Sequence, residues 1–201
     1  MINSTDVLGG NHANTHLALA VGGAQRYAVI ADAEYKQATQ FFLATLRSAH
    51  SYSTGGSNFR EFWRAAHQQG SSLFSSAAAK PGGFEGHDNE ESCTTYNFLK
   101  IARMLFEWSA EPSFLEMYNY ALNNGVLGIQ DMSAPGTMIY LLPLGNAVTK
   151  GNSSRSWGTP FNSFWCCYGT AIESFSKLAD SIYFHDEKSS ALIIARLVSS
   201  T

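Results

Sequence analysis

The sequence has little cysteine: three residues in a chain of 201. Three thiols cannot all pair, and the four, six or eight closely spaced cysteines of small secreted proteins are missing, so a disulfide scaffold is not indicated. Lysine and arginine form no run, and the formal net charge is -3. We therefore expect neither nucleic acid nor an anionic membrane surface as a partner, and a small neutral ligand is favoured.

Long hydrophobic runs are missing as well. No window approaches eighteen uninterrupted apolar residues, so no segment is expected to span a bilayer. The first thirty residues lack the basic-then-apolar order of a signal peptide, which leaves the compartment unknown. Asn-X-Ser/Thr sites at Asn3 and Asn152 are compatible with a secretory parent protein. The chain ends on the apolar run LIIARLVSST with no closing turn, so we expect it to be part of a longer protein.

Helical periodicity of the apolar residues is the dominant pattern in the sequence. Hydrophobic residues make up 45% of the chain, which is ample for a sizeable core. Apolar spacings of i, i+3, i+4 and i+7 predict helices over residues 14–30 and 34–49, from Asn97, from Pro112 and after Gly169. The last of these helices is expected to point four side chains inward: Ile172, Phe175, Leu178 and Ile182.

Consecutive helix hairpins predict an all-α fold, either a toroid or a solenoid. Polar, glycine-rich segments at residues 50–90 and 143–165 separate the hairpins, and segments of that length in a compact domain are usually functional. Residues 138–142 form a short apolar run that predicts a strand. Residues 191–198 predict a second strand, the first of a β-domain.

The cysteines lie next to predicted helix starts. Glu91 and Cys93 precede one helix, and the adjacent Cys166 and Cys167 precede another. A helix start favours thiolate over thiol, and two converging starts would present three sulfurs and a carboxylate, a set that suits tetrahedral zinc. Buried inert thiols and a redox or disulfide role are the alternatives, and the residue pattern alone does not decide among the three.

Several long motifs resemble a known family in the same order along the chain. They are NHANTHLALAVGGAQRY, SYSTGGSNFREFW, NEESCTTYNFLKIARMLFEW, NNGVLGIQ, PGTMIYLLPLG and WGTPFNSFWCCYGTAIESFSKLADSIYF. Together they resemble the catalytic domain of the β-L-arabinofuranosidases of glycoside hydrolase family 127, in particular its plant and algal branch. The resemblance implies an (α/α)6 barrel followed by β-sandwich domains. Residues 1–187 would then be part of the barrel, and residues 188–201 the start of a sandwich.

The resemblance also implies residue roles. The family's zinc ligands fall on Glu91, Cys93, Cys166 and Cys167, and Cys166 matches its nucleophile. The acid/base glutamate that follows a Thr-Gly-Gly segment falls on Glu61. Retaining glycosidases ordinarily use two carboxyl groups, and here a thiolate would replace the attacking one.

Substrate contacts are expected from two further residues. The resemblance favours His12 as a sugar contact, and Trp165 offers an aromatic face to a sugar ring. His16 is expected to pack in the helix or support the site. Core packing is the alternative reading for the aromatic residues near the motif loops, Trp63, Trp157 and Trp165. His87 and Asp88 are expected as supporting partners of the metal site, in a region where residues 71–86 depart from the family pattern.

These expectations combine into a predicted function. The chain would belong to a retaining glycoside hydrolase that releases β-L-arabinofuranosyl units from plant-type glycans or glycoproteins through a zinc-bound cysteine. Its partner would be a carbohydrate, and zinc the only cofactor. The alternative is a catalytically inactive homologue that binds carbohydrate or uses zinc to tie two loops to the helices.

Overall fold

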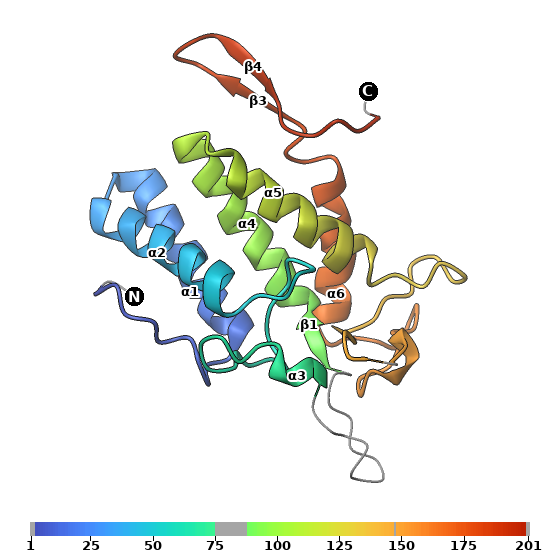
Figure 1. Cartoon of the computed structure of the whole chain (residues 1–201). Coiled ribbons are helices and arrows are strands. Elements are labelled where there is room, and N and C mark those ends of the chain that lie inside the picture. Colours follow the sequence, from blue (N-terminus) through green and yellow to red (C-terminus); the bar gives the residue numbers. More distant parts are fainter. Residues whose placement is uncertain (1–2, 75–87, 147, 200–201) are drawn as a thin grey trace.

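The computed structural model describes residues 3–74, 88–146 and 148–199, and the chain is largely helical there, as predicted (Figure 1). The α-helices are α1 (Ala13–Ile30), α2 (Ala33–Ala49), α3 (Ser71–Phe74), α4 (Ser92–Ser109), α5 (Pro112–Ala121) and α6 (Cys166–Glu173). The described residues also include one wider π-helix, η2 (Leu122–Leu127), and two tighter 3-10 helices, η3 (Lys150–Asn152) and η4 (Ser174–Leu178). The strands are β1 (Asn89–Glu91), β2 (Leu141–Leu142), β3 (Tyr183–Asp186) and β4 (Ala191–Ile194). Among the described residues, none of the helices has the length and apolar character needed to cross a membrane.

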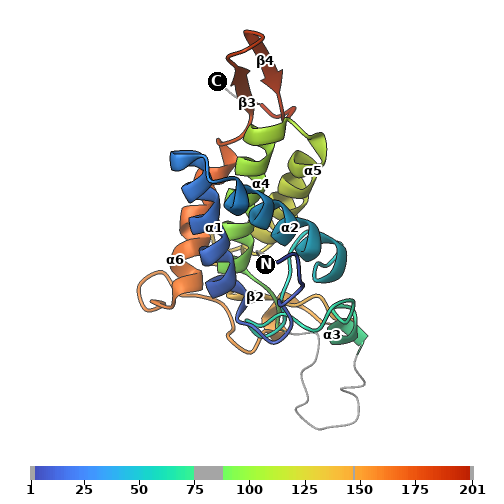
Figure 2. The same ribbon diagram turned by 90° about the vertical axis from the view of Figure 1, so that its left-hand side faces the viewer.

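Helix α4 is the central element, because it packs against α1, α5 and α6. Its buried side chains, among them Phe98, Leu99 and Leu105, join Leu17 of α1 and Tyr118 of α5 in one hydrophobic cluster. Burial of such side chains stabilises each of these helices far more than its intrinsic propensity does. The N-terminal ends of α1, α4 and α6 lie at the same end of the bundle, beside β1 and the long loops (Figures 1 and 2).

The predicted helices are present, but two begin earlier than expected, and the last one ends at Glu173 and continues as the tighter segment η4 only to Leu178, short of Ile182. Helix α4 starts at Ser92 and α6 at Cys166, so their first turns consist of polar and sulfur-containing residues that apolar periodicity does not detect. The prediction for Ile172 was wrong, since this side chain is 61% exposed. The buried face of α6 is set by Cys167 and Ala171, and Ile172 points away from it.

Two small antiparallel sheets accompany the helices. The strand predicted at residues 138–142 is confined to Leu141–Leu142, which pairs with β1. The strand predicted at residues 191–198 is present as Ala191–Ile194, and it pairs with β3 in a hairpin that extends away from the helices (Figure 1). The complete barrel, the sandwich and the division at residue 187 remain predictions.

Candidate metal centre and active site

The first turns of α4 and α6 bring the predicted zinc ligands together. Glu91 is the N-cap residue of α4 and Cys93 is its second residue, while Cys166 and Cys167 open α6. The Ser92 hydroxyl donates to the Cys167 carbonyl oxygen at 2.8 Å and fixes one helix start against the other. Because the N-cap is extended, Glu91 and Cys93 point to one place despite their i, i+2 spacing. This convergence was predicted from the sequence.

The ligand atoms of these four residues all lie within 4.8 Å of one another. The Cys167 sulfur is 3.2 Å from that of Cys93, 3.7 Å from that of Cys166 and 3.1 Å from Glu91 Oε1. Two sulfurs bound to one tetrahedral zinc at 2.3 Å are about 3.8 Å apart. The donor atoms and their spacing therefore fit zinc. Among the described residues, this is the one group of three or more His, Cys, Asp or Glu side chains that could hold a metal ion.

Electrostatics in the cluster favour a bound cation. Burial raises the pKa of both the Cys166 and Cys167 thiols, and it raises the pKa of the Glu91 carboxyl as well. Only Cys93 shifts the other way, because the Cys167 thiol donates to its sulfur and lowers its pKa. Four such groups become anionic together only beside a positive charge, which a metal ion supplies.

The three cysteines differ in their exposure to solvent. Cys93 and Cys167 are buried, at 2% and 0%, whereas Cys166 is exposed. All three sulfurs can contact one ion, but only that of Cys166 is open to a ligand arriving from solvent. The asymmetry separates the two adjacent residues in the way that the motif resemblance implies.

Glu61 lies in a loop that is pinned between the start of α1 and β1. Its carbonyl oxygen accepts a hydrogen bond from the Ala13 amide at 2.8 Å, and the amide of the preceding Arg60 donates to Asp88 O at 2.8 Å. Asn58, Arg60 and Glu61 all have positive φ values, of 78°, 48° and 69°. Left-handed backbone at three non-glycine residues is costly and persists only where surrounding contacts hold it. Contacts with α1 and the residue before β1 therefore hold Glu61 in a defined position.

Tyr140 links Glu61 to the metal cluster and was not singled out in the sequence. Its hydroxyl donates to Glu61 Oε1 at 2.5 Å and lies 3.7 Å from the Cys166 sulfur. The carboxyl oxygen and the sulfur are therefore within about 6 Å of each other, close to the carboxyl separation of retaining glycosidases. Burial and the bond to Glu61 raise the pKa of Tyr140, so its hydroxyl keeps its proton. The only sequence signal was a tyrosine within an apolar strand.

The two predicted substrate contacts border the same site. His12 Nε2 lies 4.0 Å from Glu61 Oε2. Trp165 is the N-cap residue of α6, is 52% exposed, and contacts the Tyr140 ring edge-on at 5.8 Å. Both positions border the space between Glu61 and Cys166, and their roles remain predictions.

Other residues near the motifs take structural positions. Trp63 is buried in the main core, where His16 packs against its ring, and Trp157 packs against a smaller cluster. Core packing is therefore the role that the structure gives to Trp63, His16 and Trp157. Asp88 is buried and accepts from the Ser154 amide at 2.8 Å, while His87 lies outside the described residues.

Glu90, next to the ligand Glu91, is a fully buried carboxyl group. Thr54 Oγ1 donates to its Oε2 at 2.6 Å, and its Oε1 has no hydrogen-bond partner among the described residues. A Cβ atom added at Gly56 would lie 2.0 Å from Glu90 Cδ, and one added at Gly125 would lie 2.3 Å from its Oε1. The second glycine of the Thr-Gly-Gly segment is therefore required by this close approach, as is Gly125.

We expect Glu90→Gln to stabilise the protein at pH 8 and to have little effect at pH 5. Burial raises the pKa of Glu90 from 4.5 to about 7. Because the folded carboxyl keeps its proton when the unfolded one has lost it, the wild-type free energy of unfolding falls as pH rises from 4.5 to about 7. The loss is on the order of 3 kcal/mol. Urea unfolding of Glu90→Gln and wild type at both pH values measures the difference in their free energies of unfolding, with the exposed Glu111→Gln as control. A difference of the same size at both pH values would contradict the prediction.

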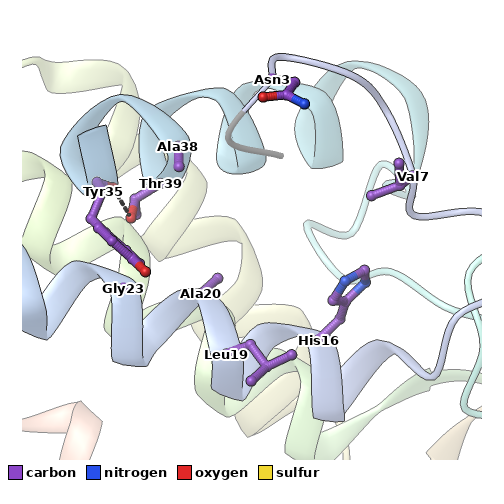
Figure 3. A pocket seen from close by; sticks show the side chains of 9 residues that line it. All are labelled: Asn3, Val7, His16, Leu19, Ala20, Gly23, Tyr35, Ala38 and Thr39. Carbon is purple, nitrogen blue, oxygen red and sulfur yellow. Dashed lines mark hydrogen bonds between the residues drawn. The ribbon is translucent and has the colours of Figure 1, made fainter.

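A separate cavity of about 420 Å³ lies between α1, α2 and the N-terminal segment (Figure 3). Its walls combine apolar side chains such as Leu19 and Ala38 with His16, Tyr35 and Thr39. No carboxylate lines it, and burial lowers the pKa of His16, so its ring is neutral. The cavity therefore lacks the acid/base groups that glycoside hydrolysis requires.

Comparisons with known proteins agree with this geometry. The family described as "Beta-L-arabinofuranosidase, GH127 catalytic domain" matches residues 1–180. Among solved structures, the chain is similar to Ara127N-Se, a GH127 beta-L-arabinofuranosidase from Geobacillus stearothermophilus T6, with a TM-score of 0.67 and 18% sequence identity. That match covers 92% of this chain but only 28% of the solved one, and it supports the fold. None of the curated proteins matches the chain.

Proposed function

Because the chain belongs to the GH127 β-L-arabinofuranosidase catalytic-domain family, we propose that it carries the active site of a retaining glycoside hydrolase. The substrate would be a β-L-arabinofuranoside in a plant-type glycan or glycoprotein. One observation carries this proposal: the exposed Cys166 sulfur and the Glu61 carboxyl group both contact the Tyr140 hydroxyl. A nucleophile and an acid at that spacing suit double displacement at one anomeric carbon.

In the first step, the Cys166 sulfur attacks the anomeric carbon while the glycosidic C–O bond breaks. Glu61 gives its proton to the departing oxygen, and a thioglycosyl group forms on Cys166. In the second step, water attacks the same carbon, the C–S bond breaks, and Glu61 takes the proton of the water. Tyr140 donates to Glu61 Oε1 throughout, which leaves Oε2 as the atom that exchanges the proton.

The residues that would hold zinc are Glu91, Cys93, Cys166 and Cys167. When bound, zinc keeps thiol groups ionised at neutral pH and fixes their positions. Thr94 supports this set, because its hydroxyl donates to Glu91 Oε2 at 2.9 Å and leaves Oε1 to face the sulfurs. His12 would contact a sugar hydroxyl beside Glu61, and Trp165 would face the ring.

We expect one equivalent of zinc in the full chain and its loss in Cys93→Ser. Cys93 is one of the buried ligands, unlike the exposed Cys166, and removing its thiolate from the closed side of the site lowers metal affinity by a factor on the order of 10² or more. Elemental analysis of reduced protein measures the metal, and circular dichroism checks that the variant is folded. Thr170→Val is the matched control, since its hydroxyl lies 3.2 Å from the Cys93 sulfur but is not a ligand. Zinc retained in Cys93→Ser, or absent from wild type, would exclude this metal site.

Hydrolysis of a synthetic β-L-arabinofuranoside by the zinc-loaded full chain tests the activity itself. Chromophore release that stops when zinc is removed supports the enzyme. Bound zinc without turnover of any furanoside would favour the alternative, in which the metal only ties the starts of α4 and α6 together.

A further inference from the structure

The cleft beside Glu61 contains two arginines, and they differ in their partners. The cleft has a volume of about 330 Å³ and is lined by Arg60, Glu61, Asp88, Leu141, Ser154 and Arg155. Arg60 Nε lies 3.7 Å from Asp88 Oδ2. Across the described ranges 3–74, 88–146 and 148–199, no carboxylate forms an ion pair with Arg155. Of the two arginines, Arg155 is therefore the one without an ion pair to a described carboxylate.

Aromatic rings hold the Arg155 guanidinium in place. Its central carbon lies 4.7 Å from the centroid of Trp165 and 5.7 Å from that of Tyr140. A guanidinium that stacks on an aromatic face keeps its N–H groups directed sideways, where they can donate to a planar anion. The two rings thus contact the guanidinium without accepting conventional N–H···O hydrogen bonds from it.

The backbone around Arg155 is anchored as well. The Tyr168 hydroxyl donates to the carbonyl oxygens of Arg155 and Ser156, at 2.8 and 3.1 Å. The Ser154 amide donates to Asp88 Oδ1 at 2.8 Å. The segment is therefore tied both to α6 and to the residue before β1. Arg155 is prepared for a ligand before one arrives, which lowers the entropic cost of binding.

The nearby acids are already engaged. Asp88 accepts from the Ser154 amide and faces Arg60, and Glu61 accepts from Tyr140. Among the described residues no carboxylate pairs with Arg155, so a negatively charged group of a ligand would be its partner. Since Glu61 lines the same cleft and would protonate the leaving oxygen, a group bound there would belong to the leaving part of the substrate.

We propose that Arg155 selects β-L-arabinofuranosides whose leaving group carries a carboxylate. The planar fork of a guanidinium matches a carboxylate through two parallel hydrogen bonds, and such charge-assisted pairs are strong in a partly enclosed cleft. This inference rests on the proposed function, because it specifies the leaving group of the same reaction. It adds a specificity residue that takes no part in the transfer of the proton or the sugar.

The test compares two substrates with the zinc-loaded full chain: para-carboxyphenyl and para-carbamoylphenyl β-L-arabinofuranoside. They have similar shapes, and only the first is anionic. We expect Arg155→Gln to reduce the ratio of their kcat/KM values about tenfold. Arg155→Lys, which keeps the charge but loses the fork, should retain part of the preference. Arg47→Gln, the same charge change at an exposed position on α2, should leave the ratio as in wild type.

An unchanged ratio in Arg155→Gln would overturn the inference. So would a variant that loses more kcat/KM on a para-sulfophenyl substrate than on the para-carboxyphenyl one, because Arg155 would then prefer a sulfonate to a carboxylate. Turnover of the neutral carbamoyl substrate reports separately on the proposed function. If neither substrate is hydrolysed, NMR titration with para-hydroxybenzoate and para-hydroxybenzamide still decides the matter. Tighter binding of the benzoate that disappears in Arg155→Gln supports the site, and equal binding of the two compounds refutes it.

Discussion

Cys166→Ser should abolish hydrolysis while the protein still binds zinc. A serine hydroxyl stays protonated at neutral pH where a metal-bound thiol is ionised, so the variant lacks its nucleophile. Three ligands, Glu91, Cys93 and Cys167, remain on the buried side of the cluster. We expect kcat to fall by a factor on the order of 10³ or more. Chromophore release and elemental analysis on the same preparation measure the two effects.

Cys167→Ser is the matched comparison, because it makes the same replacement of sulfur by oxygen at the neighbouring residue. The Cys167 sulfur is fully buried and lies next to both the Cys93 sulfur and Glu91 Oε1. This variant should lose zinc first and activity as a consequence, and excess zinc should restore part of the activity. If excess zinc also rescues Cys166→Ser, or if that variant keeps wild-type turnover, Cys166 is not the nucleophile.

The sequence predicted the helices well because their inward faces are apolar at regular spacing. It did not predict their first turns. In α4 these residues are Ser92, Cys93, Thr94 and Thr95, which are buried but not strongly hydrophobic, so the periodicity begins only at Phe98. The same limit applies to α6, whose first two residues are cysteines. Metal ligands at helix starts thus lie where hydrophobic patterns carry no information.

The clustering of Glu91, Cys93, Cys166 and Cys167 could be predicted, whereas its surroundings could not. Two helix starts with thiols indicated a shared site, and the motif resemblance specified which residues belong to it. The position of Tyr140 depends on how β2 pairs with β1, a contact between segments fifty residues apart. The turn that directs Glu61 depends on left-handed backbone at Arg60 and Glu61, which ordinary propensities disfavour. Such features follow from tertiary contacts and not from local sequence.

The hairpin of β3 and β4 shows a related limit. Residues 191–198 were predicted as a strand from β-branched composition, but their partner at residues 183–186 was not recognised. Tyr183, Phe184, His185 and Asp186 alternate between exposed and half-buried positions, but the sequence places two aromatic residues before two polar ones, so its hydrophobicity does not alternate. The pairing therefore had to come from the structure.

The second large effect is expected for Glu61→Gln, which should leave zinc content unchanged and stop turnover at a defined step. Glutamine keeps the shape of the side chain and can still accept from Tyr140, but it can neither give nor take a proton. With a poor leaving group, kcat/KM should fall by a factor on the order of 10³ or more. With dinitrophenyl β-L-arabinofuranoside, whose phenolate leaves without protonation, the first step should survive and the second should not.

The variant should therefore release one equivalent of dinitrophenolate in a burst and then stall as the glycosyl adduct on Cys166. Stopped-flow absorbance measures the burst, and intact mass spectrometry detects the added pentosyl group. Azide, a nucleophile that needs no general base, should restart turnover and yield a glycosyl azide. Exposed Glu173→Gln serves as the control for the substitution itself. Steady turnover by Glu61→Gln without azide would show that another residue handles the proton, whereas loss of zinc would mean that Glu61 supports the metal site instead.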